Sequence, residues 1–358
     1  MTRHMFAGAT TPNGFVDFYK EILPVEEAEK KIILKGSSGS GKSTFMKKLS
    51  DIFDKEGHLV ENIHCANDVN SLDGICVPTL RFCVLDGTAP HTTDPTVPAV
   101  EQIFDLGEFI DAEKALLNRD ELISLIGEKK EIHQRAGNYL KAAYNVYSNN
   151  TLIYKSLINK SALNARTLEL LSVLPNVFTN VKRKNRRFFA SSLTPDGFKS
   201  FTGTLLSGKI HVLHARDGMG ADTMLADIRS AADRLGYYTE CFYCPMNPSK
   251  LDHLTIPDLG LSYTTANQYN ASPIQAAVEI NFEEFCAPIG KYRGEIEYND
   301  GIFEMLIEKT AETMRSSRSL HMRIEEIYIA AIDFKKLDNA CDRVTLMLKN
   351  AAGRNRHG

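Results

Sequence analysis

The segment Gly36-Ser37-Ser38-Gly39-Ser40-Gly41-Lys42-Ser43-Thr44 decides the fold expected for this chain. It follows the short apolar run Ile32-Ile33-Leu34, which is typical of a buried strand. After it, apolar residues recur at helical spacing from Phe45 to Phe53, and Gly57 is placed to end the helix. A strand, a glycine-rich turn and a helix in this order predict an α/β fold.

The nine residues match GxxxxGK[ST], the pattern of the phosphate-binding P-loop. In such a loop the glycines let backbone N–H groups approach phosphate oxygens, and the N-terminus of the next helix adds a favourable dipole. We therefore expect residues 36–44 to bind a nucleotide, with Lys42 at the β- and γ-phosphates and the Ser43 hydroxyl on Mg²⁺. An accidental match is the alternative, and the flanking strand and helix argue against it.

A P-loop also needs a carboxylate on the magnesium side, at the end of a neighbouring strand. The run Arg81-Phe82-Cys83-Val84-Leu85 predicts that strand, and Asp86 follows it as a candidate Mg²⁺ ligand and catalytic residue. Capping of the next turn is a second role that Asp86 could hold at the same time. In the loop 87–95, His91 and Asp94 are candidates to orient the attacking water or to accept a proton, and hydrogen bonding within the loop is their alternative role.

The chain contains an internal repeat. The sequence 34–86 recurs 179 positions further on without a gap, and the turn Thr-Pro-(Asn/Asp)-Gly-Phe occurs at 11–15 and again at 194–198. The positions shared in the gapless part include Gly39/Gly218, Gly41/Gly220, Cys65/Cys244, Asp73/Asp252 and Pro78/Pro257.

The repeat predicts two tandem P-loop-like α/β units, 1–180 and 186–358, joined by a basic stretch at 180–187. Each unit is expected to be a mostly parallel sheet flanked by helices. Long helices are predicted at 111–149 and 299–333. The basic stretch carries no nucleic-acid-binding motif, so we expect a solvated linker and no nucleic-acid partner.

The second repeat lacks the residues that would bind Mg-ATP. Under the same shift, Gly36, Lys42, Ser43 and Asp86 become Ala215, Ala221, Asp222 and Thr265. The loss of the lysine removes the main phosphate cation, and Asp222 would repel a triphosphate. We therefore expect a degenerate loop with a regulatory or structural role, a site for another ligand, or a donor of an arginine such as Arg216 to the first site.

Composition sets further limits on function and location. Hydrophobic residues make up 43% of the chain and charged residues 24%, as in globular proteins, and the net charge of −3 gives no general attraction to nucleic acid or acidic membranes. No segment approaches the roughly 20 apolar residues of a membrane span, and no signal-peptide pattern is present, so the expected location is the cytoplasm. Seven thinly spread cysteines predict reduced thiols, and Cys241-Phe242-Tyr243-Cys244 predicts a buried strand.

With the loop 36–44, the strip Leu85–Pro95 and the degenerate second loop, the chain resembles a family of tandem P-loop proteins from anaerobic and spore-forming bacteria. The likeness covers nearly the whole chain. Members are described as ATPases or nucleotide-kinase-like proteins, so the resemblance implies the fold and ATP binding and leaves the substrate open. The chain departs from the family at Pro98-Ala99, where members have Pro-Gly.

The leading functional hypothesis is an ATPase that binds Mg-ATP at the first loop and transfers the γ-phosphate to water. The first alternative is a kinase whose acceptor, a small molecule or nucleotide, lies over the loop 88–94. The second is a nucleotide-dependent switch with little turnover. No arginine-rich lid occurs between the loop and Asp86, which favours the ATPase or the switch. The sequence names neither the acceptor nor a protein partner.

Overall fold

The computed structural model describes residues 2–175, 177–178, 183–267 and 274–354. Asn180 and Lys182 of the basic stretch lie outside these ranges. The chain forms two compact units, and neither is continuous in sequence. Unit 1 comprises Met1–Gly8, Asp17–Arg135 and Glu312–Gly358; unit 2 comprises Ala9–Val16 and Ala136–Ala311. These compact units do not coincide with the sequence ranges 1–180 and 186–358.

Unit 1 is built on a six-stranded sheet of order β1-β5-β6-β7-β4-β8. Its strands are β1 (Thr2–Met5), β4 (Lys30–Lys35), β5 (Val60–His64), β6 (Leu72–Val77), β7 (Phe82–Asp86) and β8 (Glu101–Asp105). Strand β4 runs parallel to both β7 and β8, and β1 runs parallel to β5, whereas β6 is antiparallel to both of its neighbours. The register pairs Leu34 with Asp86, so the ends of β4 and β7 lie side by side where the glycine-rich loop begins.

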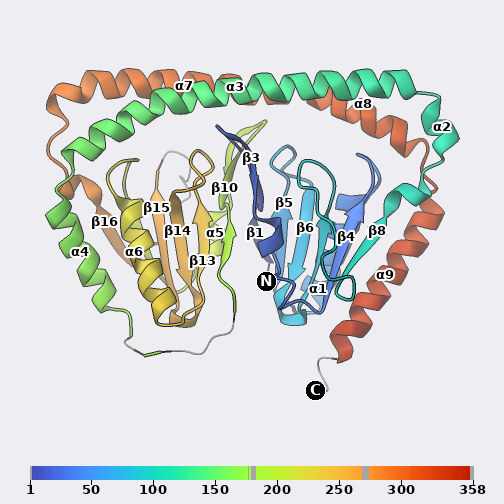
Figure 1. Cartoon of the computed structure of the whole chain (residues 1–358), viewed down its shortest axis with the longest axis horizontal. Coiled ribbons are helices and arrows are strands. Elements are labelled where there is room, and N and C mark those ends of the chain that lie inside the picture. Colours follow the sequence, from blue (N-terminus) through green and yellow to red (C-terminus); the bar gives the residue numbers. More distant parts are fainter. Residues whose placement is uncertain (1, 176, 179–182, 268–273, 355–358) are drawn as a thin grey trace. The chain divides into compact units, whose positions relative to one another are not determined.

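The helices of unit 1 come from both ends of the chain. They are α1 (Lys42–Lys55), α2 (Ala112–Leu116), the first part of α3 (Arg119–Leu157), α8 (Arg318–Ile329), α9 (Phe334–Arg354) and the short turns η1 (Tyr19–Glu21), η2 (Pro78–Leu80) and η3 (Leu106–Phe109). Buried residues of α1 and α9 share one core with the sheet, including Phe45, Leu49, Leu337, Cys341 and Leu348. In Figure 1 the red helix α9 accordingly lies beside β8 and β4.

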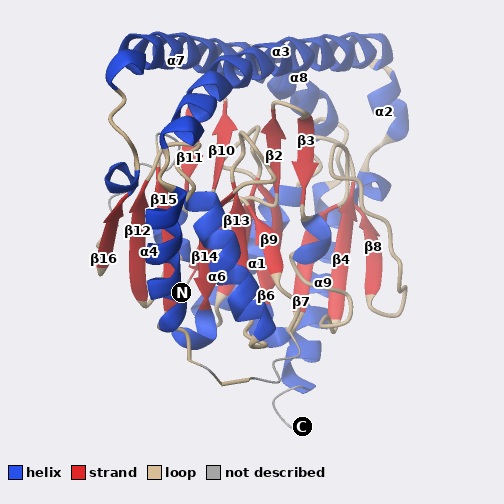
Figure 2. Ribbon diagram, turned by 60° about the vertical axis from the view of Figure 1, so that its left-hand side comes forward, coloured by secondary structure: helices blue, strands red, loops and turns tan. Residues whose placement is uncertain are grey.

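Unit 2 has a six-stranded sheet of the same strand order, β9-β13-β14-β15-β12-β16. Its strands are β9 (Arg186–Phe188), β12 (Lys209–His214), β13 (Glu240–Tyr243), β14 (Leu251–Ile256), β15 (Leu261–Ala266) and β16 (Val278–Asn281). It also contains the hairpin β10–β11 (Ser191–Thr194, Gly197–Ser200) and residues Ala9–Val16 of the hairpin β2–β3 (Gly8–Thr11, Gly14–Asp17). Its helices are the rest of α3, α4 (Lys160–Ser172), α5 (Thr202–Leu205), α6 (Ala221–Arg234), α7 (Arg293–Arg315) and the turns η4 (Pro257–Leu259), η5 (Phe282–Phe285) and η6 (Gly290–Tyr292). Figure 2 shows α4 and α6 in front of β14 and β15.

The C-terminal helices of the two sequence repeats are exchanged between the sheets. Helix α4 follows the first repeat in the chain, yet Leu163 and Leu170 pack in the core of the second sheet; α9 follows the second repeat and packs on the first sheet. An isolated backbone bridge occurs at the equivalent place in each unit. Ile110 pairs with Ile332 in unit 1, and Ile158 pairs with Cys286 in unit 2. The exchange explains why the compact units are discontinuous.

The expected α/β class is confirmed, but each sheet is mixed and not mostly parallel. The difference arises at β6, because the connection from β6 to β7 spans only Pro78 to Arg81 and a turn this short joins antiparallel strands. Glu101 to Asp105 form strand β8. None of the described helices is both long and apolar enough to cross a bilayer. All seven cysteines are free thiols.

Candidate functional site

The sequence-predicted loop lies between β4 and α1, as its residue pattern required. Gly41 is the N-cap of α1 at φ 87°, a left-handed conformation that favours glycine. Because glycine has no side chain, the N–H groups of the first helical turn receive no capping side chain. Of the expected nucleotide-binding residues, Gly36 to Gly39 are partly accessible, Ser40 is buried and Thr44 is exposed on α1. The N-cap residue of α1 thus has no side chain that would compete with an anion for these N–H groups.

The side chain of Lys42, the first residue of α1, contacts the loop. Its ammonium donates to the carbonyl oxygens of Gly36 and Ser37 at 2.8 and 2.9 Å, and lies 3.7 Å from Oδ2 of Asp86. Two buried hydroxyls of the loop, Ser37 Oγ and Ser40 Oγ, have no hydrogen-bond partner within the described part of the chain. Buried polar groups are normally satisfied, so these hydroxyls leave hydrogen-bonding capacity that a polar ligand would fill.

The two carboxylate oxygens of Asp86 face different partners. Oδ1 accepts hydrogen bonds from the backbone N–H and the hydroxyl of Thr88, at 2.9 and 2.6 Å, which caps the turn after β7. Oδ2 faces Lys42. Ser43, the other expected Mg²⁺ ligand, accepts a hydrogen bond from the N–H of Leu72 at 2.9 Å, at the start of β6.

His91 lies beside Asp86, whereas Asp94 does not join the group. The His91 ring is 6% exposed, and its Nε2 is 4.0 Å from Oδ1 of Asp86. Burial lowers the pKa of His91, so the neutral ring is favoured. The Asp94 side chain is 75% exposed and pairs with Lys35, which also donates to the carbonyls of Gly87 and Thr93. The contacts of Asp94 agree with its alternative role, which was hydrogen bonding that holds the loop 87–95.

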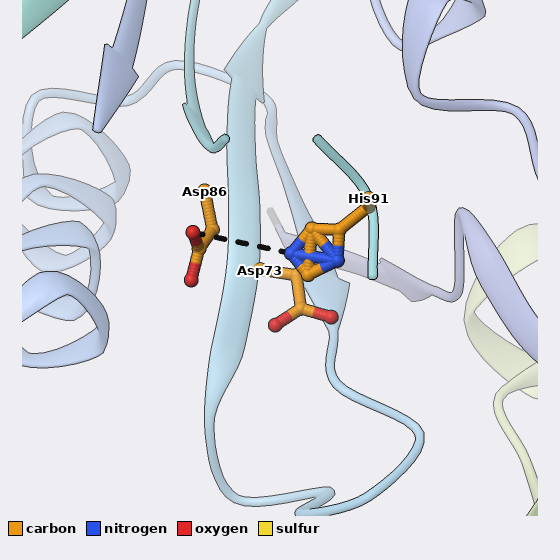
Figure 3. A group of neighbouring side chains, drawn as sticks. All are labelled: Asp73, Asp86 and His91. Carbon is orange, nitrogen blue, oxygen red and sulfur yellow. Dashed lines mark ion pairs between the residues drawn. The ribbon is translucent and has the colours of Figure 1, made fainter. Parts of the chain in front are cut away.

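The structure adds Asp73, on β6, which the sequence reasoning had not assigned to the site. Ligand atoms of Asp73, Asp86 and His91 lie within 4.8 Å of one another (Figure 3). Tyr19 contacts two members of this group. Its hydroxyl donates a hydrogen bond to Asp73 at 2.9 Å, and its ring stacks on the His91 ring with centroids 4.4 Å apart. Two features of the sequence could have indicated Asp73: it is a carboxylate within an apolar segment, and the second repeat has an aspartate, Asp252, at the same position.

Burial controls the charge of the Asp73 carboxyl. Burial and the nearby Asp86 raise its pKa to about 7, although the Tyr19 hydrogen bond and Lys42 act in the opposite direction. A carboxyl with a pKa near neutrality exchanges protons readily at physiological pH. The same burial raises the pKa of the Cys65 thiol, so that thiol stays protonated.

The donor set fits a hard divalent cation. Mg²⁺ prefers oxygen ligands, and the carboxylates of Asp73 and Asp86 supply two of them. His91 contributes a nitrogen, which suits hydrogen bonding to a ligand or water better than it suits Mg²⁺. Asp86 would therefore be the carboxylate ligand of a phosphate-bound Mg²⁺, with a ligand atom of Asp73 within 4.8 Å of it.

The corresponding loop of unit 2 carries a buried ion pair of its own. The Lys250 ammonium is buried, contacts Asp217 of the loop and lies 3.0 Å from Asp252. Burial alone would lower the pKa of Lys250, but the two carboxylates raise it well above its usual value. Arg216, considered from the sequence as a residue for the first site, pairs with Asp300 at 2.6 Å. A cavity of about 230 Å³ adjoins this loop.

No protein-family model, curated protein or solved structure matches this chain.

Proposed function

We propose that unit 1 is a P-loop ATPase that binds Mg-ATP at residues 36–44 and transfers the γ-phosphate to water. The observation that carries the proposal is the position of Lys42, whose ammonium is held by two loop carbonyls at the N-terminus of α1 and faces Asp86. Those carbonyls are neutral acceptors. A phosphate is a stronger, charge-assisted acceptor, so Lys42 would exchange its loop contacts for the β- and γ-phosphates when the nucleotide binds.

Magnesium would supply charge neutralisation to the phosphates, with Ser43 and Asp86 as its protein ligands. The Thr88 hydrogen bonds leave Oδ2 of Asp86 directed toward the loop, because both of them go to Oδ1. Capping of the turn thereby orients the carboxylate. The N–H groups of the first turn of α1, which receive no hydrogen bond from a side chain at the N-cap, would bind phosphate oxygens.

Asp73 and His91 are the proposed acid–base residues. Ligand atoms of both lie within 4.8 Å of Asp86, and the Asp73 carboxylate and the neutral His91 ring are each able to accept a proton from an attacking water. Tyr19 would act as a positioning residue, since it contacts both. We do not assign a catalytic role to Asp94, which pairs with Lys35 at the surface.

The test is calorimetric titration of Mg-ATP together with measurement of phosphate release. Wild type is expected to bind one ATP per chain and to release phosphate, and Lys42→Ala to lose both. The matched control is Asp222→Ser, at the position equivalent to Ser43 in the second loop, which should leave ATP affinity within about threefold of wild type because that loop lacks its lysine.

The outcomes separate the alternatives. ADP formation that requires an added acceptor, such as a nucleoside monophosphate, would make the protein a kinase. Binding lost in Lys42→Ala without turnover in the wild type would make it a switch. Two sites per chain, none, or an equal effect of Asp222→Ser and Lys42→Ala would overturn the asymmetric P-loop assignment.

A further inference from the structure

Helix α8 lies directly against the P-loop of unit 1. A methyl group at Gly39 would be 3.0 Å from the carbonyl oxygen and 3.1 Å from Cα of Glu325, which is closer than side-chain carbons normally come. Only glycine therefore permits this approach, and at φ 77° it also adopts the backbone conformation that the loop requires. The helix comes from the range 186–358, so residues of the second repeat lie over the nucleotide site of the first.

This approach brings a chain of ionisable side chains to the loop. The Lys129 ammonium, on α3, lies 2.9 Å from Nδ1 of His321, and Nε2 of His321 lies 3.5 Å from Oε1 of Glu325. Because an ammonium is only a donor, Nδ1 must be the acceptor, and the ring proton is on Nε2 toward Glu325. Burial, with the charge of Lys129, lowers the pKa of His321 to about 4, so the ring is neutral at physiological pH.

The group also shares the electrostatic environment of the P-loop lysine. The charge of Lys42 acts on both His321 and Glu325, as does that of Asp68 in the loop between β5 and β6. Lys42 belongs to the loop itself, and Lys129 is bonded to His321, a side chain on which the charge of Lys42 acts. Lys129 is held by a neutral acceptor, which binds a cation less strongly than a phosphate oxygen does.

We propose that Lys129 and His321 form a lid over the P-loop: Lys129 binds the terminal phosphate of the nucleoside triphosphate, and His321 is the positioning residue that holds its ammonium until the phosphate arrives. The proposal rests on the proposed nucleotide site of unit 1 and adds the residues that distinguish a triphosphate from a diphosphate. A P-loop lysine and one Mg²⁺ leave part of the triphosphate charge unbalanced, and a second lysine supplies the missing cation.

The experiment compares Mg-ATP with Mg-ADP in calorimetric titrations. Lys129→Ala should weaken Mg-ATP binding at least tenfold, as loss of a charged hydrogen bond does, and change Mg-ADP binding less than threefold. Lys129→Arg should restore most of the preference for ATP. The control is Lys130→Ala, an exposed lysine on the same helix, which should change neither affinity.

His321 gives an independent readout. His321→Ala should lower kcat of phosphate release more than it raises KM, and His321→Gln, whose side-chain oxygen still accepts from Lys129, should recover most of that loss. Far-UV circular dichroism confirms that each variant is folded.

The failures of the two proposals differ. If Lys42→Ala binds ATP normally, the nucleotide site itself is misassigned. If Lys42→Ala loses ATP binding, but Lys129→Ala weakens the binding of ATP and ADP equally or leaves both unchanged, the lid proposal is wrong. Helix α8 then only packs against the loop.

Discussion

The exchange of C-terminal helices predicts which sheet loses stability when α9 is weakened. Leu348 on α9 is fully buried in the core of unit 1, together with residues of β4 and β7. Leu348→Ala removes this packing and leaves a cavity, which costs about 3 kcal/mol for a buried leucine. Leu346, two residues earlier, is 59% exposed, so Leu346→Ala is a matched control that should cost less than about 0.5 kcal/mol.

The assay is hydrogen exchange resolved by mass spectrometry. A loss of about 3 kcal/mol accelerates exchange on the order of 100-fold for amides that exchange through opening of that unit. In Leu348→Ala the faster peptides should cover β4 and β7, which lie more than 250 residues away in sequence. The reasoning fails if the faster peptides instead cover β12 and β15, the sheet of the second repeat, or if the two leucine variants behave alike.

Three further changes test other parts of the structure. Asp86→Asn should weaken Mg-ATP binding at least tenfold and metal-free ATP binding less than threefold, because only the former needs the carboxylate; calorimetry with Mg²⁺ or EDTA measures both, and equal losses would exclude a metal role. Lys250→Ala should lower the free energy of unfolding by about 3–5 kcal/mol, because it leaves Asp217 and Asp252 buried without their ammonium. At temperatures where the variant is folded, its ATP affinity should equal that of wild type. A loss of ATP affinity in the folded variant would show that the second loop serves the first site. Burial lowers the pKa of His64 to about 4, so its contribution to stability is present above the unfolded pKa of roughly 6.5 and is lost, up to about 3 kcal/mol, as pH falls from there toward 4. Urea unfolding at pH 7 and pH 4.5 should therefore show a smaller acid loss in His64→Gln than in wild type, and identical losses would mean that other groups set the acid sensitivity.

The sequence by itself determined the features that depend on neighbours in the chain. The apolar run before Gly36, the glycine spacing and the helical periodicity after Lys42 fixed the strand, the loop and α1, since each follows from local backbone geometry. Asp86 was placed at the end of β7 for the same reason. The α/β class followed from the order of these elements.

Only the tertiary structure decided which surfaces meet. Helical periodicity indicates that α4 and α9 each bury one face, but it carries no information on which sheet covers that face. Asp73 and His91 come from separate segments, and Tyr19, which holds both, lies more than 50 residues before either. Lys129 and His321 meet beside the loop across nearly 200 residues. Such contacts are set by packing of the whole unit, because close approach of distant segments depends on shape complementarity that no local pattern records.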